Sequence, residues 1–126
     1  MPWTQFNPNP RHTRTGDCAV RAISGALDIS WDDAYLMLVT EGFNVKDMPD
    51  KNTTWGACLE QHGYRRGLVD ADCRSCYTVR DFAREHPRGT FVLGVQDHVI
   101  CLRDGSWMDT WDSGGEAPVY YWYKEE

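Results

Sequence analysis

The chain has 126 residues, which suits one domain (1–126) with a substantial apolar core and is too short for two. Its formal net charge is −6 and it has no long run of Lys and Arg, so no nucleic-acid partner is expected. No apolar stretch approaches the roughly 20 residues that a membrane span needs, and residues 1–14 lack the apolar core of a secretory signal. Five cysteines make an odd number, so we expect reduced thiols and a cytoplasmic location rather than a complete set of disulfides.

The first half of the chain predicts an irregular arm followed by helices. Residues 1–16 contain the Pro- and Asn-rich stretch FNPNP and should form an extended arm. A helix is expected from Asp17, as its N-cap, to about Leu27. Ser30 with Asp33 resembles a capping box and begins a second helix, which ends at Gly42. That second helix should turn three side chains inward, namely those of Tyr35, Leu38 and Val39.

The second half of the chain changes from helices to strands. Thr53 or Thr54 is expected to cap a third helix, and Thr78 a fourth that Pro87 ends. The stretches that follow are rich in β-branched and aromatic residues and predict strands: GTFVLGVQ, HVICLRDGSWMDTW and PVYYWYK. Helices packed on a C-terminal antiparallel sheet define an α+β fold.

Cys18 is the first candidate for chemistry, because it lies at the start of the predicted first helix. The positive end of the helix dipole and the unpaired amides there favour a thiolate, and the amides can hold a developing oxyanion. The charge of Asp17, one residue earlier, opposes the thiolate. A buried cysteine that only packs in the core fits this stretch equally well.

A nucleophilic cysteine needs a base, normally a histidine within hydrogen-bond reach. His12 lies in the arm, whereas His62 and His86 are typical of helix C-terminal turns, where they complement the dipole. His98 differs, since it begins the otherwise apolar stretch HVICL, where a polar ring needs a partner.

The Asp104-Gly105 pair is a strong hairpin signal and identifies that partner. If Asp104-Gly105 is a two-residue turn, Arg103 pairs with Ser106, and the numbers of every further pair also add up to 209. Position 98 then pairs with Trp111. His98 and Asp109 then lie on one face of the sheet as diagonal neighbours. A three-residue loop would shift the register by one and favour Asp112 instead. We prefer Asp109, which would orient the imidazole as the third member of a triad does.

The segments GDCAVRAI, HVICL and DTWDS, in this order, resemble the papain-like-fold cysteine peptidases. The likeness is greatest to small bacterial and phage-associated members and to the leader-peptidase domains of bacteriocin transporters. FNPNP followed by GDCAVRAI is also similar to small proteins of gut bacteria and their phages. The resemblance implies a papain-like fold with Cys18 as nucleophile, His98 as general base and acid, and Asp109 as orienting residue. It implies hydrolysis of an amide in a peptide or protein substrate through a thioester, without a cofactor.

The chain departs from this family at one position. Such peptidases carry a glutamine about six residues before the cysteine as an oxyanion donor, and His12 stands there in this chain. The amides of Gln5, Asn7 and Asn9 are candidates to replace it, although Asn-Pro pairs are also ordinary turn chemistry.

The remaining cysteines offer little chemistry. Cys73 and Cys76 have the C-x-x-C spacing of half a zinc site, but no second pair completes it, and a loop of ordinary thiols is the simpler interpretation. Cys58 and Cys101 are predicted to pack in the core. Two classes of function remain open: a thiol-dependent hydrolase (a peptidase, or a deamidase or isopeptidase), and an inactive module on the same scaffold that binds a protein partner.

Overall fold

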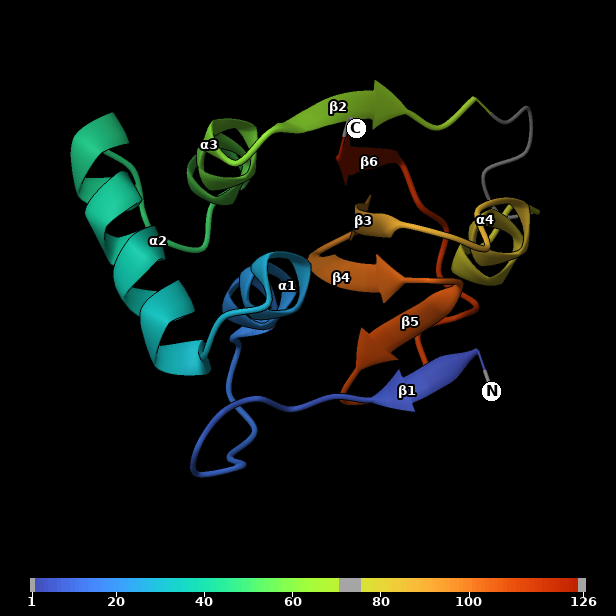
Figure 1. Cartoon of the computed structure of the whole chain (residues 1–126), viewed down its shortest axis with the longest axis horizontal. Coiled ribbons are helices and arrows are strands. Elements are labelled where there is room, and N and C mark those ends of the chain that lie inside the picture. The colour runs from blue at the N-terminus through green and yellow to red at the C-terminus, as the bar shows by residue number, and fades with distance from the viewer. Residues whose placement is uncertain (1, 71–75, 125–126) are drawn as a thin grey trace.

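One six-stranded sheet with helices on both faces organises the chain in the computed structural model, which describes residues 2–70 and 76–124 (Figure 1). The helices are α1 (Cys18–Leu27), α2 (Trp31–Val45), α3 (Asn52–Gln61) and α4 (Val79–Glu85). The strands are β1 (Trp3–Gln5), β2 (Tyr64–Leu68), β3 (Thr90–Val95), β4 (His98–Arg103), β5 (Ser106–Asp109) and β6 (Tyr120–Lys124). They lie in the order β1-β5-β4-β3-β6-β2. None of the described helices is long and apolar enough to cross a membrane.

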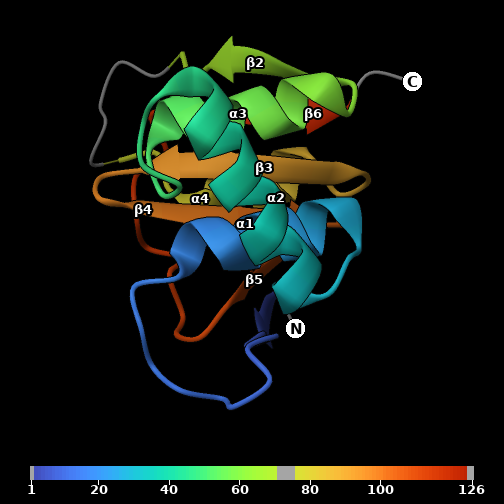
Figure 2. The ribbon, with the colours of Figure 1, turned by 90° about the vertical axis from the view of Figure 1, so that its left-hand side faces the viewer.

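The sheet buries both of its faces. Helices α1, α2 and α3 cover one face, with α2 outermost, and α4 covers the other (Figures 1 and 2). Successive residues of a strand point to opposite faces, so Cys101 packs in the core under α1 whereas Leu102 packs in the core under α4. This explains why HVICL reads as a continuous apolar run. The α+β class is confirmed.

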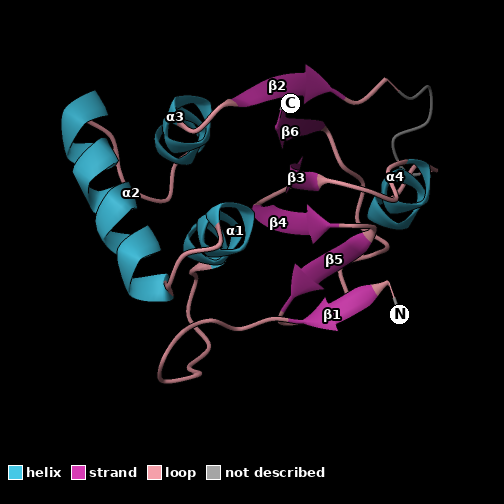
Figure 3. Ribbon diagram, viewed as in Figure 1, coloured by secondary structure: helices cyan, strands magenta, loops and turns pink. Residues whose placement is uncertain are grey.

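The sheet is mixed rather than antiparallel, and the arm is the reason. Within residues 1–16, expected to be irregular, β1 pairs in parallel with β5 along the edge of the sheet. The pairing ends with Gln5 opposite Asp109. A strand of three residues is too short to show a period in the sequence. The secondary-structure colouring of Figure 3 shows β1 beside β5, and β2 at the opposite edge, a strand that the sequence did not predict.

Three helix ends differ from the expectations. The Asp17 side chain makes no capping hydrogen bond to α1. Helix α2 continues through Gly42 to Val45, and Lys46 caps it in a left-handed conformation. The glycine at position 42 serves close packing instead of ending the helix, since a Cβ there would lie 2.8 Å from the Asp47 carbonyl oxygen. Helix α3 begins at Asn52, with Lys51 at its N-cap position.

Two of the three side chains expected to point inward from α2 are exposed. Only Leu38 is buried, while Tyr35 is 46% and Val39 is 39% exposed. Apolar residues that recur every 3.6 positions identify the apolar stripe of a helix, but they do not show how much of that stripe another element covers. The expected caps at Ser30 and Thr78 are confirmed, since each side-chain oxygen accepts a hydrogen bond from the amide three residues later.

Thr78→Ala tests whether the capping box holds α4 in place. Thr78 accepts from the Asp81 amide, and the Asp81 carboxylate accepts from the Thr78 amide. Losing this cap should lower the free energy of unfolding by about 1 kcal/mol, measured by urea denaturation. Thr40→Ala, at an exposed position inside α2, is the control and should not destabilise the protein. Equal midpoints for Thr78→Ala and wild type would contradict the role of the cap.

Candidate active site

Cys18 is the first residue of α1 and is half-buried. The His98 ring and the backbone amide of Val99, the second residue of β4, lie close enough to its sulfur to lower the pKa of the thiol. The helix N-terminus and the beginning of β4 therefore meet at this thiol, as the sequence led us to expect for Cys18 and His98.

His98 lies between the thiol and a carboxylate. It follows a two-residue turn in which Asp97 adopts a left-handed φ of 56°. Its Nε2 lies 2.7 Å from Oδ2 of Asp109, which leaves Nδ1 to face the thiol. The indole of Trp111 stacks on the imidazole with ring centroids 5.3 Å apart. The ring is therefore held from two sides.

Asp109 is the last residue of β5, and only 1% of it is exposed. Besides His98, its carboxylate accepts hydrogen bonds from the Ser113 hydroxyl at 2.7 Å and from the Thr110 amide at 2.8 Å. Arg21 on α1 also reaches it, with a nitrogen 3.3 Å from Oδ1. Four groups thus satisfy a buried carboxylate that would otherwise be strongly destabilising.

The β4–β5 hairpin has the register that brings this pair together. Arg103 pairs with Ser106 and Cys101 with Met108, so Asp104-Gly105 is a two-residue turn as predicted. Asp112, the alternative partner, instead accepts hydrogen bonds from the Trp107 indole at 2.8 Å and from the Gly114 amide. Asp109, not Asp112, is therefore the carboxylate at His98.

The surroundings shift the pKa values of all three groups. Burial raises the pKa of Cys18, but hydrogen bonds from His98 and the Val99 amide, with the positive charges of His98 and Arg21, outweigh it and bring the pKa below its ordinary value. Burial lowers the pKa of His98, yet its hydrogen bonds to Asp109 and Cys18 and their negative charges raise it to about 9. Burial raises the pKa of Asp109, but hydrogen bonds from His98 and Ser113 bring it below its usual range. The directions for Cys18 and His98 both favour a thiolate beside an imidazolium over a neutral thiol beside a neutral ring.

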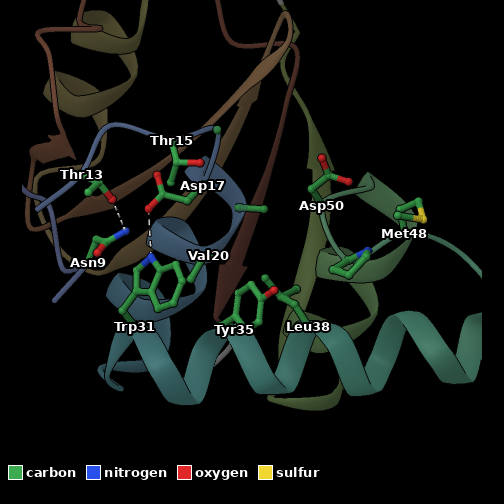
Figure 4. Close-up of a pocket in the computed structure, with 13 residues that line it drawn as sticks. Asn9, Thr13, Thr15, Asp17, Val20, Trp31, Tyr35, Leu38, Met48 and Asp50 are labelled. Carbon is green, nitrogen blue, oxygen red and sulfur yellow. Dashed lines mark hydrogen bonds between the residues drawn. The ribbon is translucent and has the colours of Figure 1, made fainter. Parts of the chain in front are cut away.

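Two cavities flank the thiol. One of about 390 Å³ lies beside Arg14 and Trp111, and one of about 610 Å³ lies beside Asp50 and Trp55. Both are lined by Cys18 and His98, together with Gly16 and Asp97, so an extended chain could cross the sulfur from one cavity to the other. A third cavity of about 500 Å³ is walled by Trp31 and Tyr35 (Figure 4). It shares Gly16 with the linings of the other two.

The expected side-chain donors for an oxyanion are not at the thiol. Neither cavity at Cys18 is lined by any of Gln5, Asn7 and Asn9. Gln5 is exposed on β1, and Asn9 donates to the Thr13 hydroxyl and accepts from the Arg11 amide, which is turn chemistry. The backbone amides in the first turn of α1, beginning with that of Cys18, have no intrahelical acceptor and are the donors that the helix supplies.

The other cysteines and histidines behave as side chains of the core and of helix ends. Cys58 and Cys101 are buried free thiols, as expected. His62 and His86 each direct Nδ1 at a carbonyl oxygen of the last helical turn, at 2.8 Å. Cys76 is disulfide-bonded, so the expectation of an ordinary thiol is wrong there, while Cys73 lies outside the described residues. The described part of the chain contains no group of three or more His, Cys, Asp or Glu side chains placed to hold a metal ion.

Sequence reasoning missed the role of Arg21 at this site. Arg21 is 8% exposed, and its guanidinium lies between the carboxylates of Asp109 and Asp17. The indole of Trp31 donates to the other oxygen of Asp17 at 2.9 Å. A charged residue three positions after the cysteine, inside a helix with a large apolar stripe, was the available signal, but the sequence cannot tell it from a solvated arginine.

The chain was compared with protein-family models, with curated proteins and with solved structures, and nothing matches it.

Asp109→Asn tests the charge that acts on His98. Without the negative charge, the pKa of His98 should fall from about 9 by one unit or more, and the ring should be largely neutral at pH 8.5. The measurement is the chemical shift of the His98 ring protons as a function of pH. Asp112→Asn removes a carboxylate of the same hairpin that does not touch His98, and should leave the titration unchanged. An identical titration in Asp109→Asn and wild type would contradict the assignment.

Proposed function

We propose that this protein is a cysteine peptidase-like hydrolase with a papain-like arrangement, in which Cys18 forms a thioester with the acyl part of a peptide or protein substrate. The observation that carries the proposal is the arrangement of three side chains in series: the His98 ring lies beside the Cys18 thiol and lowers its pKa, and His98 Nε2 lies 2.7 Å from Oδ2 of Asp109. The nucleophile begins a helix, and its base and orienting carboxylate come from adjacent strands of a hairpin. This is the geometry that nucleophilic catalysis needs.

The first half of the reaction would use the thiolate and the protonated ring. The Cys18 thiolate attacks the amide carbon, a C–S bond forms, and the carbonyl electrons move to oxygen. Backbone amides of the first turn of α1 stabilise that oxyanion. The His98 imidazolium then donates its proton to the leaving nitrogen, the C–N bond breaks, and the amine departs from the thioester.

The second half would use the neutral ring. His98 takes a proton from water, the hydroxide attacks the thioester carbon, and the C–S bond breaks to release a carboxylic acid and the thiolate. Asp109 holds the ring with Nε2 toward itself and Nδ1 toward the sulfur throughout. The cavities on both sides of Cys18 support a substrate that extends beyond the scissile bond in both directions.

The rate of iodoacetamide labelling as a function of pH tests the thiolate. Labelling of Cys18, followed by mass spectrometry, should stay fast well below pH 8.5, and His98→Ala should move the profile to higher pH. Cys58 and Cys101 are internal controls, because burial raises their pKa values to about 11 and about 12, and they should remain unlabelled in the folded protein.

Turnover is tested with p-nitrophenyl acetate, an ester that any acylating thiolate can cleave. We expect a burst of p-nitrophenol equivalent to one acyl group per chain, absent in Cys18→Ala and in wild type alkylated at Cys18. Slow labelling that does not depend on His98, with no burst, would reject the hydrolase. It would favour the alternative of an inactive binding module.

A further inference from the structure

Arg21 is the least expected charged residue in the molecule. It lies three residues after Cys18 on α1 and is 8% exposed. Its guanidinium uses two different nitrogens: Nη1 donates to Oδ1 of Asp17, and Nη2 lies 3.3 Å from Oδ1 of Asp109. A lysine has one nitrogen and could not donate from two separated atoms in the same way.

Asp17 would oppose the chemistry at Cys18 if its side chain behaved as N-cap carboxylates usually do. An N-cap carboxylate accepts a hydrogen bond from an amide of the first turn, and so lies over the helix terminus. Here the Asp17 side chain makes no such bond: Oδ1 binds Arg21, and Oδ2 accepts from the Trp31 indole at 2.9 Å (Figure 4). The first-turn amides are thereby left to the thiolate and to a developing oxyanion.

The second contact of Arg21 joins two distant parts of the chain. Asp109 is 88 residues away in sequence and lies on β5, whereas Arg21 belongs to the helix that begins with the nucleophile. The contact therefore fixes the helix that carries Cys18 relative to the strand whose carboxylate orients His98. A geometry of this kind has to be held to a fraction of an ångström for efficient attack.

We propose that Arg21 is a positioning residue of the active site: it draws the Asp17 carboxylate off the N-terminus of α1 and ties that helix to the carboxylate that orients His98. The inference rests on the proposed role of Cys18 as the nucleophile. In the segment DCAVR, the charge of Asp17, directly before the cysteine, is then neutralised by Arg21, three residues after it.

The test is a double-mutant cycle read by the pH profile of iodoacetamide labelling at Cys18. Arg21→Met removes a positive charge near the thiol and frees the Asp17 charge at the helix terminus, so the midpoint of the profile should rise by about one pH unit. Asp17→Asn alone should not raise it. Asp17→Asn combined with Arg21→Met should bring the midpoint back to within about half a unit of wild type, a rescue that a merely structural role of Arg21 would not produce.

The controls isolate this ion pair. The other charged groups around Cys18 are unchanged in these variants: His98, which Asp109 holds from behind, and the charged residues that line the two cavities, namely Arg14, Asp47, Asp50, Lys51 and Asp97. Arg84→Met breaks a comparable pair with Asp81 on α4, where Arg84 is 69% exposed, and should leave the profile unchanged. Cys58 and Cys101 must stay unlabelled in every variant, which shows that each is folded.

The outcomes separate the two proposals. An ordinary wild-type profile, with a midpoint near 8.5, would overturn the proposed function and with it this inference. A low wild-type midpoint that Arg21→Met leaves unchanged, or a rise that Asp17→Asn does not reverse, would overturn the role of Arg21 alone. If Arg21→Met does not fold, Arg21→Lys replaces it: a smaller rise in the midpoint is expected, and no change would overturn the inference.

Discussion

The buried carboxylate of Asp109 is the interaction on which the rest of the site depends. A carboxylate that is 1% exposed is stable as an anion only if hydrogen-bond donors and positive charge surround it. Here the donors come from separate parts of the fold: His98 from β4, Arg21 from α1, and Ser113 from the loop after β5. The contacts that stabilise the buried carboxylate are therefore the same contacts that hold the parts of the candidate site together.

The end of β5 that carries Asp109 is held from the edge of the sheet as well. The Asp109 carbonyl oxygen accepts hydrogen bonds from the Phe6 amide at 2.9 Å and from the Trp3 indole at 3.3 Å. Because β1 adds to β5 in parallel, a short N-terminal segment protects a strand edge that would otherwise be open. The arm thus has a supporting role at the site, although none of its side-chain amides reaches the thiol.

Charge is arranged in alternation around the thiol. A series of contacting side chains with alternating negative and positive charge leads to Cys18. Its members, in order, are Asp17, Arg21, Asp109 and His98. The Asp17 carboxylate is shared between Arg21 and the Trp31 indole, and the Asp109 carboxylate has four partners, so no single ion pair has to offset the desolvation of both charges. The thiolate also lies at the N-terminus of α1, whose amides can stabilise the negative charge that develops on the substrate oxygen during acyl transfer.

The sequence by itself determined the α+β class, the two-residue β4–β5 turn and the pairing of His98 with Asp109, because these follow from local periodicity and turn chemistry. It also identified Cys18 at a helix start. Tertiary structure alone decided the rest. Strand β1 has too few residues to show a period, and β2, with the sequence YRRGL, lacks the apolar alternation of a strand. The exposure of Tyr35 depends on which elements cover α2. Arg21 acquires its role only from Asp109, a residue that packing rather than sequence proximity brings to it.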